Sequence, residues 1–190
     1  MSRQALLQSV VDVARAIFLS KASSIAVLDR SSGRFRFEAV AGEGAEVLLG
    51  TSFPGGAGIA GSVAQAGEPI IVDDLSRDPR FARGVAERSG YVPNAMMVAP
   101  LIGEQDTLGV LSVLDRGHTG RSSLEELNLL SAFATQAAIA LALGERAERT
   151  STPPDARVAR LIARIDALSG PRREAGLALL DAVETLLRGD

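Results

Sequence analysis

The sequence predicts an α+β domain in which helices at both ends flank an antiparallel sheet. Apolar residues recur with the helical spacing i, i+3, i+4 over residues 3 to 20, and again from Ser122 to about Glu148. Between these segments, apolar and β-branched runs come in pairs that short polar turns connect. Because a short connection forces neighbouring strands to run antiparallel, the sheet is predicted to be antiparallel.

The turns place the individual strands. SSIAVLDR and RFRFEAVAG are separated by SSG, in which Gly33 supplies the backbone freedom of a tight hairpin. A second hairpin joins NAMMVAPLIG to TLGVLSVLDR through the turn EQD, and EPIIVDD makes a further short strand. We expect residues 44 to 56 to form a glycine-rich loop, followed by a short helix, GIAGSVAQAG, that Gly67 terminates.

Residues 72 to 85, VDDLSRDPRFARGV, carry three carboxylates in a short stretch. Oxygen ligands clustered in a loop suit Ca²⁺ or Mg²⁺, but the spacing is too short for an EF-hand and lacks its glycine and distal Glu, so we predict no metal site. Asp78 is instead expected to cap a helix with Pro79 in its first turn, and Asp73 or Asp74 to end the preceding strand. We interpret the segment as the start of a lid that Phe81 anchors to the core.

The C-terminal part of the chain has two further helical patterns. Ser122 or Ser123 is predicted to cap the long helix, with Glu125 or Glu126 closing a capping box. The paired prolines of TSTPPD end that pattern, and two amphipathic stripes follow. We therefore divide the chain into a domain over 1–148, a linker over 149–155 and a C-terminal helical hairpin over 156–190.

The composition excludes several classes of protein. The 190 residues are 46% hydrophobic with a net charge of −3, which suits a globular protein and gives no general attraction to nucleic acid. The absence of Cys removes disulfides and thiolate chemistry. No leader pattern is evident, and no run approaches the roughly 18 to 20 apolar residues of a membrane span, so we expect a cytoplasmic protein without membrane contact.

The residues give no support for catalysis. His118, the single His, lies in the loop-like RGHTGR, and no G-x-S-x-G turn is present to supply a nucleophile. The glycine-rich PGGAGIAG lacks the Lys-Ser/Thr pair that holds phosphates and Mg²⁺ in a nucleotide-hydrolysing loop. We therefore do not expect an enzyme.

The order of elements and three sequence stretches resemble the GAF domain family. The stretches are PGGAGIAGSVAQAGEPIIVDDLSRDPRF, the strand ending MVAPL, and TLGVLSVLD before the last helix, and the resemblance covers roughly residues 3 to 147. It implies a central antiparallel sheet of about six strands, with the terminal helices on one face and a loop-covered small-molecule pocket on the other.

The resemblance also suggests which residues line that pocket. Positions that contact ligand in cyclic-nucleotide-binding members correspond here to Ser24, Val40, Ala41, Ile59, Ala60, Ala86, Ser89 and Pro93. We add Tyr91, because a phenol combines an apolar body with a hydroxyl, and Met96. Met96 and the adjacent Met97 must point to opposite faces of their strand, so only one of them can face the pocket.

Cyclic nucleotides are disfavoured as ligands. Positions that read the purine in such members fall at Ala41 and Ala86, whose side chains form no hydrogen bonds. Asp115 and Arg116 replace the Asn-Lys pair of the signature of those cyclic-nucleotide binders, although an ion pair between Arg116 and Glu126 stays open. Backbone amides at Ile59 and Ala60 could still meet a phosphate.

The family's other activities bear on cofactors. Covalent bilin attachment and methionine-sulfoxide reduction in the family both use Cys, so we predict no cofactor beyond an unidentified, noncovalent small ligand.

The expected function is a non-catalytic regulatory module that binds a small molecule and relays occupancy through helices that form a homodimer. The first alternative is a ligand-independent module for dimerisation or for binding a protein partner through the C-terminal helices. The second is an RNA-binding regulator. Arg157, Arg160 and Arg164, with Arg172 and Arg173, supply cations for it, but nearby acidic residues and the lack of aromatics make nucleic acid the weakest expectation.

Overall fold

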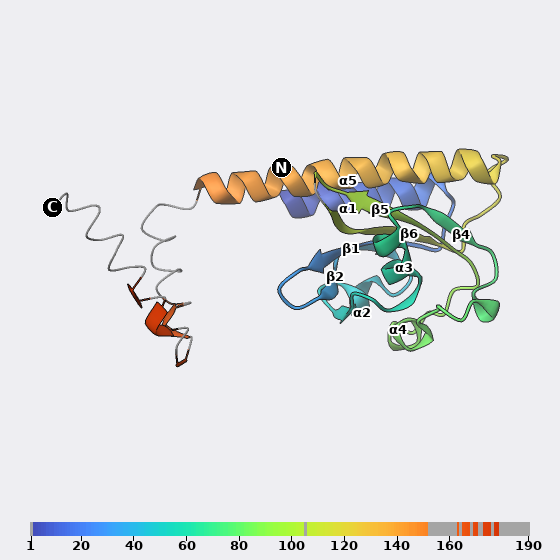
Figure 1. Ribbon diagram of the computed structural model, residues 1–190. Coiled ribbons are helices and arrows are strands. Elements are labelled where there is room, and N and C mark those ends of the chain that lie inside the picture. Colours follow the sequence, from blue (N-terminus) through green and yellow to red (C-terminus); the bar gives the residue numbers. More distant parts are fainter. Residues whose placement is uncertain are drawn as a thin grey trace. The chain divides into compact units, whose positions relative to one another are not determined.

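The computed structural model describes residues 2–104, 106–151, 163, 165–167, 169–170, 173–175 and 177–178 (Figure 1). The chain divides into two compact units, Met1–Gly144 and Glu145–Asp190. The first unit contains the whole sheet. Most of the predicted linker over 149–155 and of the predicted hairpin over 156–190 lies outside the described residues.

The sheet has six antiparallel strands in the order β3-β2-β1-β6-β5-β4. Both predicted hairpins are confirmed, and Gly33 adopts the left-handed φ of +64° that its turn requires. The strands are β1 (Ala22–Asp29), β2 (Arg34–Gly42), β3 (Ser52–Pro54), β4 (Ile70–Val72), β5 (Met96–Ile102) and β6 (Thr107–Leu114). The two hairpins join through β1 and β6 at the centre of the sheet.

Helices cover both faces of this sheet (Figure 1). The helices are α1 (Arg3–Ile17), α2 (Ala45–Leu48), α3 (Gly58–Ala66), α4 (Arg83–Arg88) and α5 (Ser123–Ser151), with a 3₁₀ turn η1 (Leu75–Arg77) before α4. Gly67 ends α3 with a φ of +71°, as predicted. The predicted capping box also forms, because Ser122 N donates to Glu125 Oε2 at 2.8 Å and Glu125 N donates to Ser122 Oγ at 3.3 Å.

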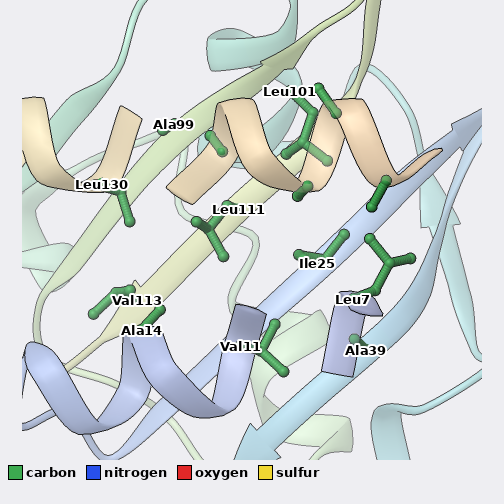
Figure 2. Close-up of a cluster of buried hydrophobic side chains, with 14 of the residues drawn as sticks. Leu7, Val11, Ala14, Ile25, Ala39, Ala99, Leu101, Leu111, Val113 and Leu130 are labelled. Carbon is green, nitrogen blue, oxygen red and sulfur yellow. The ribbon is translucent and has the colours of Figure 1, made fainter. Parts of the chain in front are cut away.

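The main core lies between the sheet and the two terminal helices (Figure 2). Figure 2 shows Leu7, Val11 and Ala14 on α1 and Leu130 on α5, over the strands that carry Ile25, Leu111 and Val113. Met97 belongs to this cluster and is fully buried. The prediction that Met96 and Met97 face opposite sides of the sheet is therefore confirmed.

A second core cluster fills the opposite face, and a β-bulge in β2 decides which residues reach it. The register passes from Ala26↔Phe37 to Ile25↔Ala39, so Glu38 has no partner in β1. An extra residue reverses the alternation of side chains along a strand. Phe37 therefore packs in the second cluster, whereas Ala39 and Ala41 pack under the terminal helices.

The segment Ser123–Gly144 corrects one expectation from the sequence. By length and composition this 22-residue stretch of α5 could cross a membrane, although no such run was expected. Core helices of globular domains pass the same test. Its side chains at Leu130, Ala134, Ala137 and Leu141 pack against the sheet, so it is a partly buried core helix.

Candidate ligand-binding site

A cavity lies on the face of the sheet opposite α1 and α5, with a volume of about 100 Å³. Strands β1, β2, β5 and β6 form its floor, and α3 and the segment around α4 form its walls. Its lining is mostly apolar and comprises Ser24, Ala26, Phe37, Glu43, Leu48, Phe53, Ala57, Gly58, Ile59, Ala60, Phe81, Ala82, Val85, Ala86, Ser89, Tyr91, Pro93, Met96, Val110, Ser112 and Leu114.

The start of α3 forms one wall, and the glycines of its motif explain how it fits there. A Cβ on Gly61 would lie 2.6 Å from the carbonyl carbon of Gly56, so only glycine lets the helix approach the preceding loop. The N-cap residue Ala57 makes no side-chain capping bond. The first-turn amides of α3 therefore lie at the cavity without a side-chain partner.

The lid, defined here as residues 74–93, starts differently from the prediction. Asp74, and not Asp78, is the capping residue, since its carboxylate accepts from Ser76 N at 3.0 Å at the start of η1. Asp78 instead forms a turn in which its carboxylate accepts from Arg80 N at 2.9 Å, and α4 begins only at Arg83. Pro79 therefore lies in the turn before α4, because Asp78 closes a local turn first.

One contact of Arg80 joins the lid to α3, and several others brace the lid internally. The Arg80 guanidinium forms an ion pair with Asp78 at 2.7 Å and donates to Ser62 Oγ of α3 at 3.2 Å. This partnership lowers the pKa of Asp78 and raises that of Arg80.

At the other end of the lid, the buried Ser89 hydroxyl donates to the carbonyl of Ala86 at 2.6 Å and accepts from Tyr91 N at 3.2 Å. Phe81 lines the cavity and packs on the second core cluster, in keeping with its predicted anchoring role.

Tyr91 connects the lid to the end of β6. Its hydroxyl donates to the carboxylate of Asp115. Burial, followed by this hydrogen bond, raises the pKa of the Tyr91 phenol well above its usual value. The other oxygen of Asp115 accepts from the backbone amides of Asn94 and Ala95 at 2.8 and 2.9 Å.

The next residue, Arg116, connects the same corner to the start of α5. Its guanidinium donates to Glu126 at 2.8 Å and to Asp73 at 3.0 Å, so the ion pair that the sequence left open does form. The buried Glu126 also accepts from the Thr119 hydroxyl at 2.8 Å. His118 lies exposed in the same loop, as expected.

Eight of the ten residues predicted to contact a ligand line the cavity. They are Ser24, Ile59, Ala60, Ala86, Ser89, Tyr91, Pro93 and Met96. Val40 and Ala41 do not line it. The bulge at Glu38 turns Ala41 toward the helix layer, and Val40 joins the second core cluster without reaching the cavity.

Sequence reasoning missed several lining residues. Phe37 and Phe53 pack with their rings tilted by 39° and their centroids 5.2 Å apart, and both line the cavity. Ser112 lies directly opposite Ser24 in the pairing of β1 with β6. The alternation of side chains in TLGVLSVLD could have placed Ser112 on the same face as Val110. It could not have placed Ser112 beside Ser24, because Ser24 belongs to the other hairpin.

The cavity carries little charge. Among the described residues that line it, Glu43 is the only charged one. In the described part of the chain no three His, Cys, Asp or Glu side chains gather as metal ligands would.

A six-stranded antiparallel sheet with terminal helices on one face and a covered cavity on the other defines a class of α+β domains built around a pocket. The chain belongs to the GAF domain family, whose model matches residues 2–141. The neighbouring solved structures are also GAF domains, which agrees with the observed fold.

Solved structures with this fold come from several kinds of protein. The GAF domain of an Acinetobacter phosphoenolpyruvate-protein phosphotransferase has a TM-score of 0.65 at 22% identity, covering 77% of this chain and 86% of its own. The GAF-B domain of DevS from Mycobacterium smegmatis has a TM-score of 0.61 at 21% identity, covering 79% of this chain and all of its own. A free methionine-R-sulfoxide reductase from Neisseria meningitidis has a TM-score of 0.63 at 18% identity, covering 77% of this chain and 81% of its own. At these identities the likeness concerns the fold.

Curated relatives match only part of the chain. A dual 3',5'-cyclic-AMP and -GMP phosphodiesterase 11 from Drosophila melanogaster is 36% identical over 62 residues, which is 32% of this chain. A cGMP-specific 3',5'-cyclic phosphodiesterase from Drosophila sechellia is 34% identical over 80 residues, which is 42% of this chain. The matched segments span only 4% and 6% of those proteins.

Proposed function

We propose that this protein is a non-catalytic regulatory module that binds a small molecule beneath residues 74–93 and transmits occupancy to α5. GAF domains are typically regulatory modules that bind small molecules. The observation that carries the proposal is the covered apolar cavity, whose lining comes partly from the sheet and partly from the lid. A ligand there contacts both, so it favours whichever lid position completes its contacts.

The size of the cavity argues for a lid that adjusts. Ligand pockets usually measure roughly 300 to 1,000 Å³, whereas this one is about 100 Å³. A larger ligand therefore requires the lid to move outward, and a smaller one fits the present form.

The proposed relay runs through one corner of the domain. Tyr91 in the lid bonds to Asp115, and the adjacent Arg116 bonds to Glu126 in the first turns of α5. A displacement of Tyr91 therefore acts on the residue next to the buried ion pair at the start of α5. The contacts thus connect the lid, where a ligand binds, to the start of α5. Coupling between two sites requires that binding at one changes the free energy of the other, and these contacts provide a route for that change.

A cavity-blocking variant tests the proposal. Ala86→Phe places a large side chain from the lid into the cavity, and Glu87→Phe places the same side chain on the exposed side of α4. We expect a compound from a metabolite library, or one retained in native mass spectrometry, to raise the melting temperature of the wild type and of Glu87→Phe only. If no compound stabilises the wild type, or if one stabilises all three proteins equally, the proposal is wrong.

A ligand-independent interaction module is the second candidate, and exposed apolar side chains on the terminal helices favour it. Ile139 and Leu143 of α5 are 48% and 57% exposed. An exposed apolar stripe of this kind suits a homodimer. Sedimentation of Ile139→Glu should show a monomer if the stripe pairs, whereas Ile102→Glu, at a site that is 54% exposed on β5, should not change the oligomeric state.

The expected cytoplasmic location and the RNA-binding alternative both stay predictions. The cytoplasmic location belongs to the proposed role and has its own test in fractionation of cells. Of the cations proposed for RNA binding, Arg157, Arg160, Arg164 and Arg172 lie outside the described residues, and Arg173 forms an ion pair with Asp166 at 3.4 Å.

A further inference from the structure

We propose that the cavity selects a small uncharged molecule with an apolar body and one hydroxyl or carbonyl oxygen, and that the hydroxyls of Ser24 and Ser112 bind that oxygen. This inference rests on the proposed function, because it names the ligand class of the same cavity. Three observations carry it: the placement of the two serines, their lack of partners, and the charge of the cavity.

The two hydroxyls lie side by side on the floor of the cavity. Ser24 in β1 and Ser112 in β6 are register partners, and both line the cavity. Directly opposite residues on antiparallel strands have Cβ atoms about 4.5 to 5.5 Å apart. One ligand oxygen between them can therefore meet both side chains.

Neither hydroxyl has a hydrogen-bond partner among the described residues. Ser24 and Ser112 are 7% and 6% exposed, and in the described part of the chain neither hydroxyl bonds to another side chain or to a backbone group. Buried polar side chains are normally hydrogen-bonded, and a buried hydroxyl without a partner destabilises the fold. In the described part of the chain the hydroxyl buried without a partner is that of Ser23, whereas those of Ser24 and Ser112 line the cavity and can be reached from it. A ligand oxygen in the cavity can therefore satisfy both of them.

The charge of the cavity excludes anionic ligands. No Lys, Arg or His occurs among its lining residues, and Glu43 contributes a negative charge. The amides at the start of α3 supply only a partial positive charge. A phosphate or carboxylate would lose its hydration in an apolar cavity without a counter-charge. A neutral oxygen pays a much smaller penalty, and each serine offers it one donor and two acceptor positions.

Ring compounds that differ in a single group test the inference. We would follow amide resonances of the ¹⁵N-labelled protein during titration with cyclohexanol, cyclohexanone, methylcyclohexane and cyclohexanecarboxylate. Cyclohexanol and cyclohexanone should shift resonances of cavity residues with the lowest Kd, and the carboxylate should shift none. The comparison with methylcyclohexane needs no variant, so it stands even if a serine variant fails to fold.

The variants locate the interaction. In Ser24→Ala/Ser112→Ala the Kd of cyclohexanol should rise roughly tenfold and approach that of methylcyclohexane, as the loss of one or two hydrogen bonds implies. Ser23→Ala is the matched control, because Ser23 is equally buried in β1 but does not line the cavity. Its Kd for cyclohexanol should equal that of the wild type.

The outcomes separate this inference from the proposed function. Equal affinity for cyclohexanol and methylcyclohexane, an unchanged Kd in the double variant, or tighter binding of the carboxylate would overturn the ligand class and leave the cavity as a binding site. If no ring compound shifts any cavity resonance, the ligand class is overturned as well. The Ala86→Phe comparison then decides separately whether the cavity binds anything.

Discussion

The hydroxyl of Tyr91 donates a hydrogen bond to the carboxylate of Asp115, and this bond ties the lid to the end of β6. Asp115 has a φ of +47°, a left-handed conformation that Asp tolerates better than most residues. The same carboxylate accepts from two backbone amides just before β5. Its side chain therefore fixes three segments at once: the lid, the start of β5 and the loop that leads to α5.

Removing the Tyr91–Asp115 bond should loosen the lid and leave the sheet intact. In Tyr91→Phe we expect faster hydrogen exchange over residues 74–93 and a loss of about 1 to 2 kcal/mol of stability, because one hydrogen bond to a charged acceptor is lost. Asp115→Asn is the matched variant, since its amide oxygen can still accept from Asn94 and Ala95. Unchanged exchange in the lid of both variants would contradict this role.

Tyr91 should ionise only at strongly alkaline pH. It is the only Tyr, and the chain has no Trp, so tyrosinate absorbance reports this residue alone. Burial and the Asp115 bond raise the pKa of the phenol above its usual 10.0. A raised folded-state pKa means that the contribution to stability is complete below the unfolded value and is lost as pH rises through the folded value. Denaturant titrations above pH 10 should therefore show falling stability, and Asp115→Asn should shift the absorbance transition to lower pH; an unshifted transition would count against the contact.

The ion pair between Glu126 and Arg116 should contribute more to stability than any ion pair at the surface. Glu126→Leu leaves the largely buried guanidinium of Arg116 without its 2.8 Å partner, so we expect a loss of about 3 kcal/mol in chemical denaturation. In the double variant Arg116→Leu/Glu126→Leu much of that loss should return, because no unpaired charge remains. A double variant as unstable as Glu126→Leu would show that the charge pairing matters little.

Two buried serines should respond in opposite directions to removal of the hydroxyl. Ser23 is fully buried and its hydroxyl has no partner among the described residues, so Ser23→Ala should raise the free energy of unfolding by about 1 kcal/mol. Ser89→Ala removes bonds to Ala86 and Tyr91 and should lower it by a similar amount. Equilibrium denaturation of both variants checks the contrast; a loss in both would point to an unrecognised partner of Ser23.

Gly61 should not tolerate a side chain. Gly61→Ala would bring a Cβ against the backbone of Gly56, and we expect a loss of about 1 to 3 kcal/mol through overpacking. Gly84→Ala is the control, because no atom lies within 4 Å of its Cβ position and Ala favours the helix. Thermal melts of the two variants should therefore move in opposite directions, and a neutral Gly61→Ala would refute the close-approach explanation.

Local chemistry made some of the fold predictable. Gly33, Gly67 and the Ser122–Glu125 capping box were predicted because each depends on a few neighbouring residues. The short strand β3 was not predicted from its residues, since Pro54 and the following glycines read as a loop and only pairing with β2 makes it a strand. The prediction that Asp78 caps a helix was wrong for a related reason. Asp74 and Asp78 are both good local cap residues, and the packing of the lid decides which of them caps.

The amino-acid sequence by itself determined α1, α3, α5, the two hairpins and the absence of thiol chemistry, because periodicity and turn residues act locally and composition needs no structure. Only the tertiary structure decided which side chains reach the cavity. The bulge at Glu38 moved Ala41 to the helix face, and the pairing of β1 with β6 set Ser24 beside Ser112. Both depend on hydrogen bonds between strands. Residues that pair across a sheet can be far apart in the sequence, so the spacing of residues along the chain does not predict which of them meet.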